Sequence, residues 1–453
     1  MEESAAAVKS AQEYVASCAR CLKPEGRCAD KDGSVPQRVH ARSQATAETL
    51  LADELLVRSL SALPQNYDFE VAKTVERIRR EGFERVALQL PEGLQMYACT
   101  LVDVLSRLCR TETNPAGCAF VVLADVTYGA CCVDDLAAWR LGCDFLVHYG
   151  HSCLVPVQSL HVKTMYVFVR IAFDVEHLLA CIREHFGERS RSIHLMLLST
   201  IQFQSCLALI AKSLHEYGWF ASVSAPQTRP LSRGELLGCT APVLGSDHGA
   251  QDDDVSAGEM TAVVYVGDGR FHLESAMIHN PQVEEFYRYD PYAKQLTREF
   301  YDHTSMMRER WEAVQCAREP QARFWGVILG TLGRQGNPKI LRRLLGLLRD
   351  GKKEFVVILC NEITPEKLQR LSKSGIQVWV QVACPRLSID WGKNFAPGGA
   401  PVLTPYEAMV ALGRVSWRQK RYPMDYYSKH GGPWSNYFVS EEKSAVSMKP
   451  SGS

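Results

Sequence analysis

The segment Asp125-Val-Thr-Tyr-Gly-Ala-Cys-Cys-Val-Asp-Asp135 follows an apolar run, 120–124, that is typical of a buried β-strand. Open parallel sheets bind ligands beyond the carboxyl ends of their strands, so Cys131 and Cys132 are expected at such a position. Comparable places in the sequence are occupied by Cys239, in Leu-Leu-Gly-Cys-Thr, and by Cys384, which follows the strand-like run 378–383. We therefore consider these cysteines first as ligands of a shared metal.

Alternating strand and helix patterns from residue 69 onward predict an α/β fold with right-handed crossovers. The first round has predicted helices at 71–81, 94–108 and 133–141, and strands at 86–90, 120–124, 145–149 and 165–169. The second has helices at 175–186 and 208–217, and strands at 193–198, 221–225 and 261–266. The third has strands at 324–329, 355–360 and 378–382, and helices at 297–317, 339–348 and 365–372.

Three rounds of similar length predict three similar small domains, each with a mainly parallel sheet flanked by helices, and with the metal site between the domains. The expected domains are 63–168, 169–292 with an acidic insertion at 245–259, and 293–440 with an irregular C-terminal segment. Segments 1–62 and 441–453 are expected to be mostly disordered tails.

The composition indicates which partners and which cellular location to expect. Lysine plus arginine and aspartate plus glutamate both number 51, so no net field attracts nucleic acid or anionic lipid. The sequence has no apolar run long enough to cross a bilayer and no apolar signal-peptide core, which makes a cytoplasmic location the expectation. In a reducing compartment the 16 cysteines stay thiols, and most are expected to be small buried hydrophobes.

Cys131, Cys239 and Cys384 lie far apart in the chain, and closing loops of such length costs roughly 4 kcal/mol, so the folded domains must bring them together. Three soft thiolates suit an iron–sulfur cluster and leave one of four irons open to a substrate. Alternatively, all three are ordinary buried thiols, or Cys131 or Cys153 serves a zinc or thiol hydrolase with His148 or His151. The tail residues Cys18, Cys21 and Cys28 make half a zinc site at best.

Two glycine-rich turns follow predicted strands. In Ile328-Leu-Gly-Thr-Leu-Gly-Arg-Gln-Gly-Asn-Pro-Lys, exposed backbone N–H groups and a helix beginning at Asn337-Pro338 suit an anion. In Tyr265-Val-Gly-Asp-Gly-Arg-Phe-His, the glycines allow close approach of a ligand while three polar side chains supply charge. The alternatives are tight packing for the first turn and a simple capped turn for the second. The candidate ligand-binding residues are Gly267, Asp268, Gly269, Arg270, His272, Gly330, Gly333, Gln335 and Gly336.

Arg386, two residues after Cys384, is a candidate for a two-point clamp on a ligand carboxylate. A solvated arginine is the alternative at this position.

With these residues in place, the chain resembles the eukaryotic diphthamide-synthesis enzyme family, and within it the first subunit. The resemblance spans residues 66 to about 412. It is carried by Asn66-Tyr-Asp-Phe-Glu, Leu88-Gln-Leu-Pro-Glu-Gly-Leu, 125–135, His148-Tyr-Gly-His-Ser-Cys, Ser199-Thr-Ile-Gln-Phe, Gly238-Cys-Thr, 267–272, Tyr289-Asp-Pro-Tyr, 330–336, Val382-Ala-Cys-Pro-Arg-Leu-Ser-Ile-Asp-Trp and Leu403-Thr-Pro-Tyr-Glu.

The resemblance implies that Cys131, Cys239 and Cys384 hold one 4Fe-4S cluster, with Cys131 chosen over Cys132 because it follows Tyr-Gly-Ala. It also implies that S-adenosylmethionine is cleaved at its methionine γ-carbon, and that the 3-amino-3-carboxypropyl radical adds to a histidine of translation elongation factor 2. This is the first step of diphthamide synthesis. The implied partners are a related second subunit, in a heterodimer, and a small electron-donor metalloprotein. A non-catalytic partner subunit of the same complex is the alternative within the family.

Overall fold

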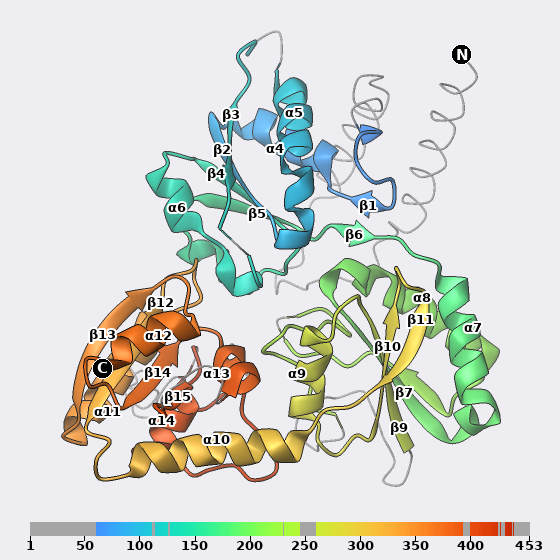
Figure 1. Ribbon diagram of the computed structural model, residues 1–453. Coiled ribbons are helices and arrows are strands. Elements are labelled where there is room, and N and C mark those ends of the chain that lie inside the picture. Colours follow the sequence, from blue (N-terminus) through green and yellow to red (C-terminus); the bar gives the residue numbers. More distant parts are fainter. Residues whose placement is uncertain are drawn as a thin grey trace, which may run out of the picture. The chain divides into compact units, whose positions relative to one another are not determined.

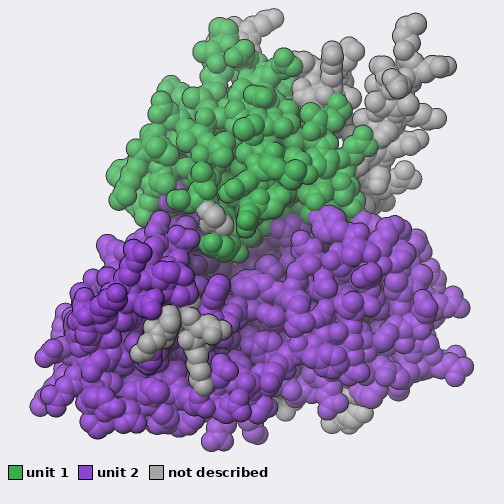
Figure 2. Space-filling model, viewed as in Figure 1, with its two compact units in different colours: residues 1–128, 135–151, 156–172 green, residues 129–134, 152–155, 173–453 purple. Residues whose placement is uncertain are grey.

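The computed structural model describes residues 60–110, 114–125, 127–229, 231–244, 260–392, 399–424, 426, 431–436 and 438. The predictions made for Cys18, Cys21 and Cys28, for the acidic insertion and for the C-terminal tail fall outside these residues. The chain forms two compact units, coloured separately in Figure 2. Unit 1 comprises 1–128, 135–151 and 156–172, and unit 2 comprises 129–134, 152–155 and 173–453.

Unit 1 is built on a parallel four-stranded sheet of order β3-β2-β4-β5 (Figure 1). A separate two-stranded antiparallel sheet pairs β1 with β6. Helices α4 and α5 pack on the sheet because their apolar faces join the strand side chains in one hydrophobic cluster. The elements are β1 (Tyr67–Asp68), α4 (Val71–Glu81), β2 (Arg85–Gln89), η1 (Glu92–Tyr97), α5 (Ala98–Cys109), β3 (Ala119–Leu123), α6 (Asp135–Arg140), β4 (Phe145–Tyr149), η3 (Val157–Ser159), β5 (Lys163–Val167) and β6 (Arg170–Ile171).

Unit 2 contains two further sheets, of order β11-β10-β9-β7-β8 and β13-β12-β14-β15. The part of the chain that contains the first of these sheets comprises α7 (Val175–Phe186), η4 (Gly187–Ser192), β7 (Ile193–Ser199), α8 (Ile201–Tyr217), β8 (Ser222–Ser224), β9 (Met260–Val266), α9 (Phe271–His279), β10 (Glu285–Asp290) and β11 (Gln295–Glu299). The second comprises α10 (His303–Arg318), β12 (Phe324–Gly330), α11 (Pro338–Asp350), β13 (Glu354–Cys360), α12 (Pro365–Ser372), β14 (Val378–Val382), α13 (Pro385–Trp391), β15 (Val402–Leu403) and α14 (Pro405–Ala411). The short helix η2 (Ala130–Cys132) also belongs to unit 2.

All three sheets repeat one strand order. In each, the first strand in sequence lies between the second and the third, and the fourth follows the third: β3-β2-β4-β5, β8-β7-β9-β10 and β13-β12-β14-β15. The prediction of three mainly parallel sheets flanked by helices is confirmed. In open α/β sheets, ligands commonly bind where the strand order reverses, which in these sheets is at the carboxyl ends of the first and third strands.

One predicted helix is wrong at its beginning. Residues 297–299 lie in β11, which pairs antiparallel with β10 through Phe286↔Glu299 and Asp290↔Gln295, and the helix begins only at His303. The Asp302 side chain accepts a hydrogen bond from the Ser305 N–H and fixes that start. The hairpin was missed because its strands are rich in charged and polar residues, which mimic a solvated helix face.

The strand β13 forms an edge of the third sheet and is unusually exposed for an apolar segment (Figure 1). Val356, Val357 and Leu359 are exposed, Leu359 to 67%. The inner strands β12 and β14 are buried instead, and their residues Trp325 and Trp379 are fully buried. Burial of one such large apolar side chain contributes roughly 1.5–3 kcal/mol, so the centre of this sheet carries its stability.

A buried ion pair joins helices α10 and α14 of the third sheet's core. Arg310 donates from Nε and Nη2 to the two carboxylate oxygens of Glu407, both at 2.7 Å, and Nη2 also donates to the Val402 carbonyl at 2.8 Å. The Tyr422 hydroxyl donates to the same carboxylate at 2.8 Å. Glu407 also completes a capping box with Thr404, so one carboxylate fixes the start of α14 and its packing.

Arg310→Leu is expected to lower the free energy of unfolding by about 3–5 kcal/mol, because it leaves the Glu407 carboxylate buried without its cation. Chemical denaturation of the variant measures this loss. Arg308→Leu, at an exposed position of the same helix, is the control and should change stability by less than about 0.5 kcal/mol. Equal losses in the two variants would contradict a role for the buried pair.

Candidate functional site

Cys131 and Cys132 lie on η2, which follows β3 in the chain. Cys131 is half-buried and Cys132 is fully buried. The Cys132 N–H donates to the Gly129 carbonyl at 2.9 Å, and the Cys131 carbonyl accepts from the Arg334 N–H at 2.9 Å. The doublet is therefore held by the glycine-rich turn that follows β12.

That turn approaches the doublet closely at Gly333. Gly333 has a φ of +53°, and a Cβ atom there would meet the backbone of Cys132 and Val133. Only glycine combines this backbone conformation with such an approach. Gly333 is therefore needed for the close packing of its turn against the loop that carries Cys131. Tight packing was the alternative to anion binding in the sequence-based interpretation of this turn.

Cys239 lies on a tight turn between β8 and β9. Leu237 and Thr240 exchange backbone hydrogen bonds of 3.0 and 3.3 Å across this turn. Gly238 faces the Phe271 ring, which occupies the space that a Cβ would take. Cys239 belongs to a buried apolar cluster that also contains Ala130 and Leu237, and Cys131 packs against this cluster.

Cys384 follows β14 and is the residue at which α13 begins. Its carbonyl accepts from the Gln381 side-chain amide at 2.9 Å and from the Leu387 N–H at 3.1 Å. Cys131 follows β3 and Cys239 follows β8, and each of these is the second strand of its sheet in sequence order. Cys384 differs, because it follows β14, the third strand of its sheet.

The four thiols influence one another electrostatically. The pKa of Cys131 is raised well above its usual range by its hydrogen bond with Cys132, by burial and by the charges of Cys132, Cys239 and Cys384. Burial raises the pKa of Cys384 to about 11, with Arg386 acting in the opposite direction and Cys132 adding to the rise. All four thiols belong to unit 2, and Cys132, Cys239 and Cys384 each act on the pKa of Cys131.

The donor set bears on which metal would fit. A single zinc ion needs its sulfur ligands at about 2.3 Å from one point, and in the described part of the chain no three His, Cys, Asp or Glu side chains are arranged to hold one ion. An iron–sulfur cluster is ligated at separate iron atoms, so its cysteines stand further apart, and it prefers thiolates. By ligand type, a set of cysteine thiolates suits an iron–sulfur cluster.

Arg386 connects the elements that carry Cys384 and Cys239. Its guanidinium is 2% exposed and donates to the Phe271 carbonyl at 2.6 Å and to the Gly238 carbonyl at 3.3 Å. It also pairs with the Asp390 and Glu274 carboxylates. Burial alone would lower the pKa of Arg386, but the charges of Asp390 and Glu274 raise it.

These contacts give Arg386 a positioning role that the sequence did not suggest. The carboxylates that it grips belong to the protein, and its remaining donors hold the turn beside Cys239. Clamping of a ligand carboxylate by Arg386 stays a prediction.

The turn 267–272 joins β9 to α9. Its backbone is fixed by a bond from the Gly267 N–H to the Tyr289 carbonyl, 3.0 Å, and by Arg288, which donates to the Asp268 carbonyl at 3.0 Å. Arg270 pairs with Glu299 and donates to the Phe300 carbonyl at 2.8 Å. Asp268, Gly269 and Arg270 are exposed and His272 is half-buried. The capped turn is thus present, and ligand binding by this turn stays a prediction.

The turn 330–336 is closed by its own glycines. A Cβ at Gly336 would meet the Gly330 carbonyl, and a Cβ at Gly330 would approach Ala383 to 2.7 Å. The predicted helix start after it is confirmed: the Asn337 side chain accepts from the Lys339 N–H at 2.7 Å, and Pro338 occupies the first turn.

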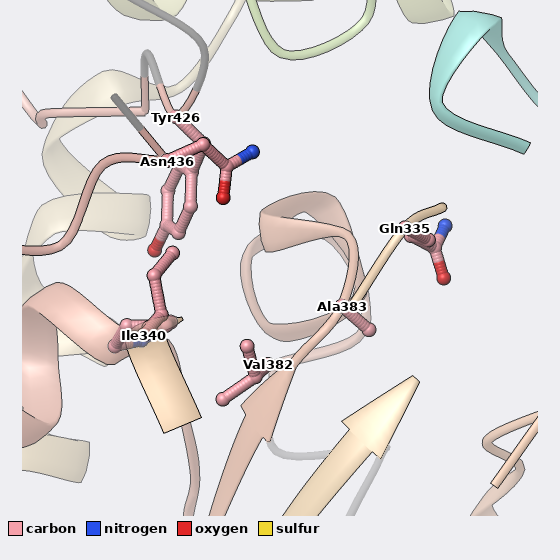
Figure 3. Close-up of a pocket in the computed structure, with 7 residues that line it drawn as sticks. Gln335, Ile340, Val382, Ala383, Tyr426 and Asn436 are labelled. Atoms are coloured by element: carbon pink, nitrogen blue, oxygen red, sulfur yellow. The ribbon is translucent and has the colours of Figure 1, made fainter. Parts of the chain in front are cut away.

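A pocket beside this turn has an empty volume of about 230 Å³. Figure 3 shows Ile340, Val382 and Tyr426 around it, with Gln335 at its far side. Ligand binding by Gln335 and the neighbouring glycines stays a prediction.

The residues of the rival hydrolase hypothesis have other contacts. His148 Nδ1 lies 2.9 Å from Gln89 Oε1, and Cys153 Sγ donates to the Val155 carbonyl at 3.5 Å. Burial lowers the pKa of His148 well below its usual range and that of His151 to about 4. Such weak bases are poorly matched to activating a thiol at neutral pH.

Gly333→Ala is expected to lower the free energy of unfolding by about 2 kcal/mol or more, since it adds a left-handed backbone cost to a clash with Cys132. It should also speed alkylation of Cys132, measured by mass spectrometry. Gly346→Ala, in the middle of α11 with open space around its Cα, is the matched control and should stabilise slightly. Unchanged alkylation of Cys132 would contradict the seating role of Gly333.

The buried histidines predict acid sensitivity. Burial lowers the pKa of His279 to about 4, so the unfolded chain binds protons first as the pH falls below 6.5. Stability is therefore complete above pH 6.5 and is lost toward pH 4, by up to roughly 3 kcal/mol for this residue. His279→Phe should flatten the fall in denaturation midpoints, whereas His215→Phe, at an exposed position of α8, should leave it unchanged.

Comparison with known proteins identifies the family to which this chain belongs. Residues 90–423 match a family described as "Putative diphthamide synthesis protein". The chain is 50% identical to the human 2-(3-amino-3-carboxypropyl)histidine synthase subunit 1, covering 85% of this chain and 81% of the relative. The Dictyostelium discoideum protein of the same name is 46% identical, covering 87% of this chain and 78% of the relative.

A solved structure also matches. The crystal structure of Dph2 from Pyrococcus horikoshii with a 4Fe-4S cluster is 26% identical, with a TM-score of 0.59, covering 78% of this chain and 93% of that one. No helix among the described residues is long and apolar enough to cross a membrane. The family match over most of the chain, the relatives near 50% identity and the common fold show that this chain belongs to the diphthamide-synthesis family, among its histidine synthase first subunits.

Proposed function

We propose that this chain is the iron–sulfur subunit of an S-adenosylmethionine-dependent transferase that places a 3-amino-3-carboxypropyl group on a histidine of translation elongation factor 2. The proposal is carried by membership of a family whose relatives are named for this product, and it is supported by the effect of Cys239 and Cys384, from two other segments, on the pKa of Cys131. The archaeal structure with the same fold binds a 4Fe-4S cluster.

The residues of this chain would hold the cluster through three thiolates, which leaves one iron for the sulfur of the co-substrate. When bound and reduced, the cluster supplies the electron that breaks the bond between sulfur and the methionine γ-carbon. The thioether of the nucleoside would leave, and the carbon radical would add to an imidazole carbon of the protein substrate. Release of a proton to solvent and return of the electron to the oxidised cluster would restore the aromatic ring.

The protein's part in this chemistry is positioning. Arg386 ties the Cys384 helix to the Cys239 turn, and Gly333 seats the Cys131 loop. The burial of these thiols keeps water away from a reactive carbon radical, which would otherwise be lost to side reactions. The turns 267–272 and 330–336 are our candidates for holding the amino acid and nucleoside parts of the co-substrate.

The relatives are named subunit 1, which supports assembly with further chains. We propose that the partner is a related second subunit and that a small metalloprotein donates the electron. A non-catalytic role for this chain within the complex is the second candidate, favoured by the same subunit name. Cleavage of S-adenosylmethionine by the chain alone and with its partner, followed by chromatography, separates the two roles.

Cys239→Ala is expected to reduce bound iron from about four per chain to less than half of that, and to abolish formation of the aminocarboxypropyl product. Anaerobic purification, iron analysis and visible absorbance measure the first effect. Cys316→Ala, at an exposed position of α10, is the matched control and should keep its iron. Full iron and activity in Cys239→Ala would refute shared ligation.

Iron analysis also shows whether Cys131 or Cys132 is the cluster ligand. Cys131→Ala should lose iron as Cys239→Ala does, while Cys132→Ala should keep most of it, because the half-buried Cys131 is the proposed ligand. The reverse result would move the ligand to Cys132 without affecting the proposed reaction.

A further inference from the structure

The third sheet has one open apolar edge. Among the described strands, β13 pairs only with β12, and it ends the sheet (Figure 1). Its side chains Val356, Val357 and Leu359 are exposed, Leu359 to 67%, although residues of these types are mostly buried in proteins. Proteins normally shield such an edge with charged residues, prolines or a covering element. The edge of β13 is therefore suited to pairing with another chain.

The backbone of β13 offers hydrogen-bonding groups along this edge. The Glu354 N–H donates to the Arg323 carbonyl at 3.0 Å, and the Cys360 carbonyl accepts from the Thr331 N–H at 2.9 Å. Successive residues of a strand direct their backbone groups to opposite sides, so the even-numbered residues of β13 bond β12. The odd-numbered residues direct three N–H and three C=O groups outward; they are Phe355, Val357 and Leu359.

Helix α11 places cations beside the same edge. It carries four basic residues against a single acid, Asp350, which pairs with Arg414 at 3.2 Å. The Arg349 guanidinium lies over the Phe355 ring, 5.6 Å from its centroid. Arg342 is also exposed and precedes Arg349 by two helical turns, so both project from one side of the helix, about 10 Å apart along its axis.

The two arginines flank the exposed apolar side chains. Val357 and Leu359 share a sheet face with Phe355, because side chains two residues apart in a strand point to the same side. Helix α11 runs from the end of β12 back to the beginning of β13, so Arg342 lies about three strand residues beyond Phe355. The edge thus combines outward backbone groups, an apolar surface and two exposed cations.

Charge decides between the occupants that this edge can take. Antiparallel pairing with β13 of a second copy, centred on Val357, places Arg349 opposite Arg342 of that copy, and opposed like charges are destabilising. An incoming strand with acidic residues on this face instead brings opposite charge to the same two arginines. The edge therefore favours an acidic segment over a second copy of this chain.

We propose that β13 binds an extended segment of another protein, which adds to the third sheet as a strand with acidic side chains on the α11 face and apolar side chains on the α12 face. The apolar side chains cover Val356 and the half-buried Ile358, which packs in one cluster with Leu368 of α12. Affinity comes from the backbone hydrogen bonds, and selectivity comes from the two arginines. This interaction does not depend on the iron–sulfur chemistry proposed above.

The test is fluorescence anisotropy of the full-length chain with two labelled synthetic peptides. The acidic peptide is Val-Glu-Val-Glu-Val-Glu-Val, and its control has lysine in place of each glutamate. We expect the acidic peptide to bind about 10-fold more tightly or better, with an affinity that falls as sodium chloride is added, because exposed charges are screened. Equal binding of the two peptides, or no binding of the acidic one at about 1 mM, overturns the proposal.

Variants test whether the peptide binds at the edge. Val357→Pro removes an outward N–H without removing a bond to β12, and it should weaken binding of the acidic peptide about 10-fold. Val357→Thr keeps the N–H and is the matched control, with unchanged affinity. Arg342→Glu and Arg349→Glu should each weaken binding about 3- to 10-fold, whereas Arg308→Glu, at an exposed position of α10, should not. Unchanged affinity in Val357→Pro places the peptide elsewhere and overturns the proposal.

Thermal melts show which variants fold, and the arginine variants carry the test if Val357→Pro does not fold. Analytical ultracentrifugation of the chain alone tests the rival occupant. A dimer that Val357→Pro dissociates, and that the acidic peptide does not disrupt, assigns the edge to a second copy and overturns the proposal. A monomer that binds the acidic peptide through this edge supports it.

Discussion

The buried guanidinium of Arg386 is the interaction on which the arrangement of thiols depends. It lies two residues after Cys384, contacts the carbonyl of Gly238 next to Cys239 and pairs with Glu274 on the helix that begins at the 267–272 turn. Removing a partner from such a buried charge costs about 3–5 kcal/mol, so these elements can hardly separate without breaking the core. A positive charge held beside cysteines also favours their thiolate forms, which are the forms that bind iron.

Much of this architecture was predictable, because local patterns of apolar residues and of helix-starting residues determine it. The helix 175–186 and the strands 378–382 and 324–329 have apolar periods that match their structure, and Asn337-Pro338 fixes a helix start by residue type alone. The three cysteines could be selected because each follows a strand-like run. The 285–299 hairpin escaped detection because charged residues interrupt the aromatic residues of the inner strand β10, and because the edge strand β11 is mostly polar.

Long-range contacts were beyond the sequence. Apart from Asp390, the partners of Arg386 lie more than a hundred positions away, so only the folded chain shows that its donors are committed to protein carbonyls and carboxylates. The same is true of Gly333, whose requirement for glycine comes from the backbone of Cys132 and not from its own turn.

The three sheets share one strand order, yet their outer edges are not equally protected. The strand β13 ends its sheet with Val356, Val357 and Leu359 turned outward, and its free backbone edge can pair with any extended chain. A cell that makes more of this polypeptide than of the proteins able to cover that edge would accumulate copies prone to self-association. Matched synthesis of the complex's members would then protect the protein's solubility as much as its catalysis.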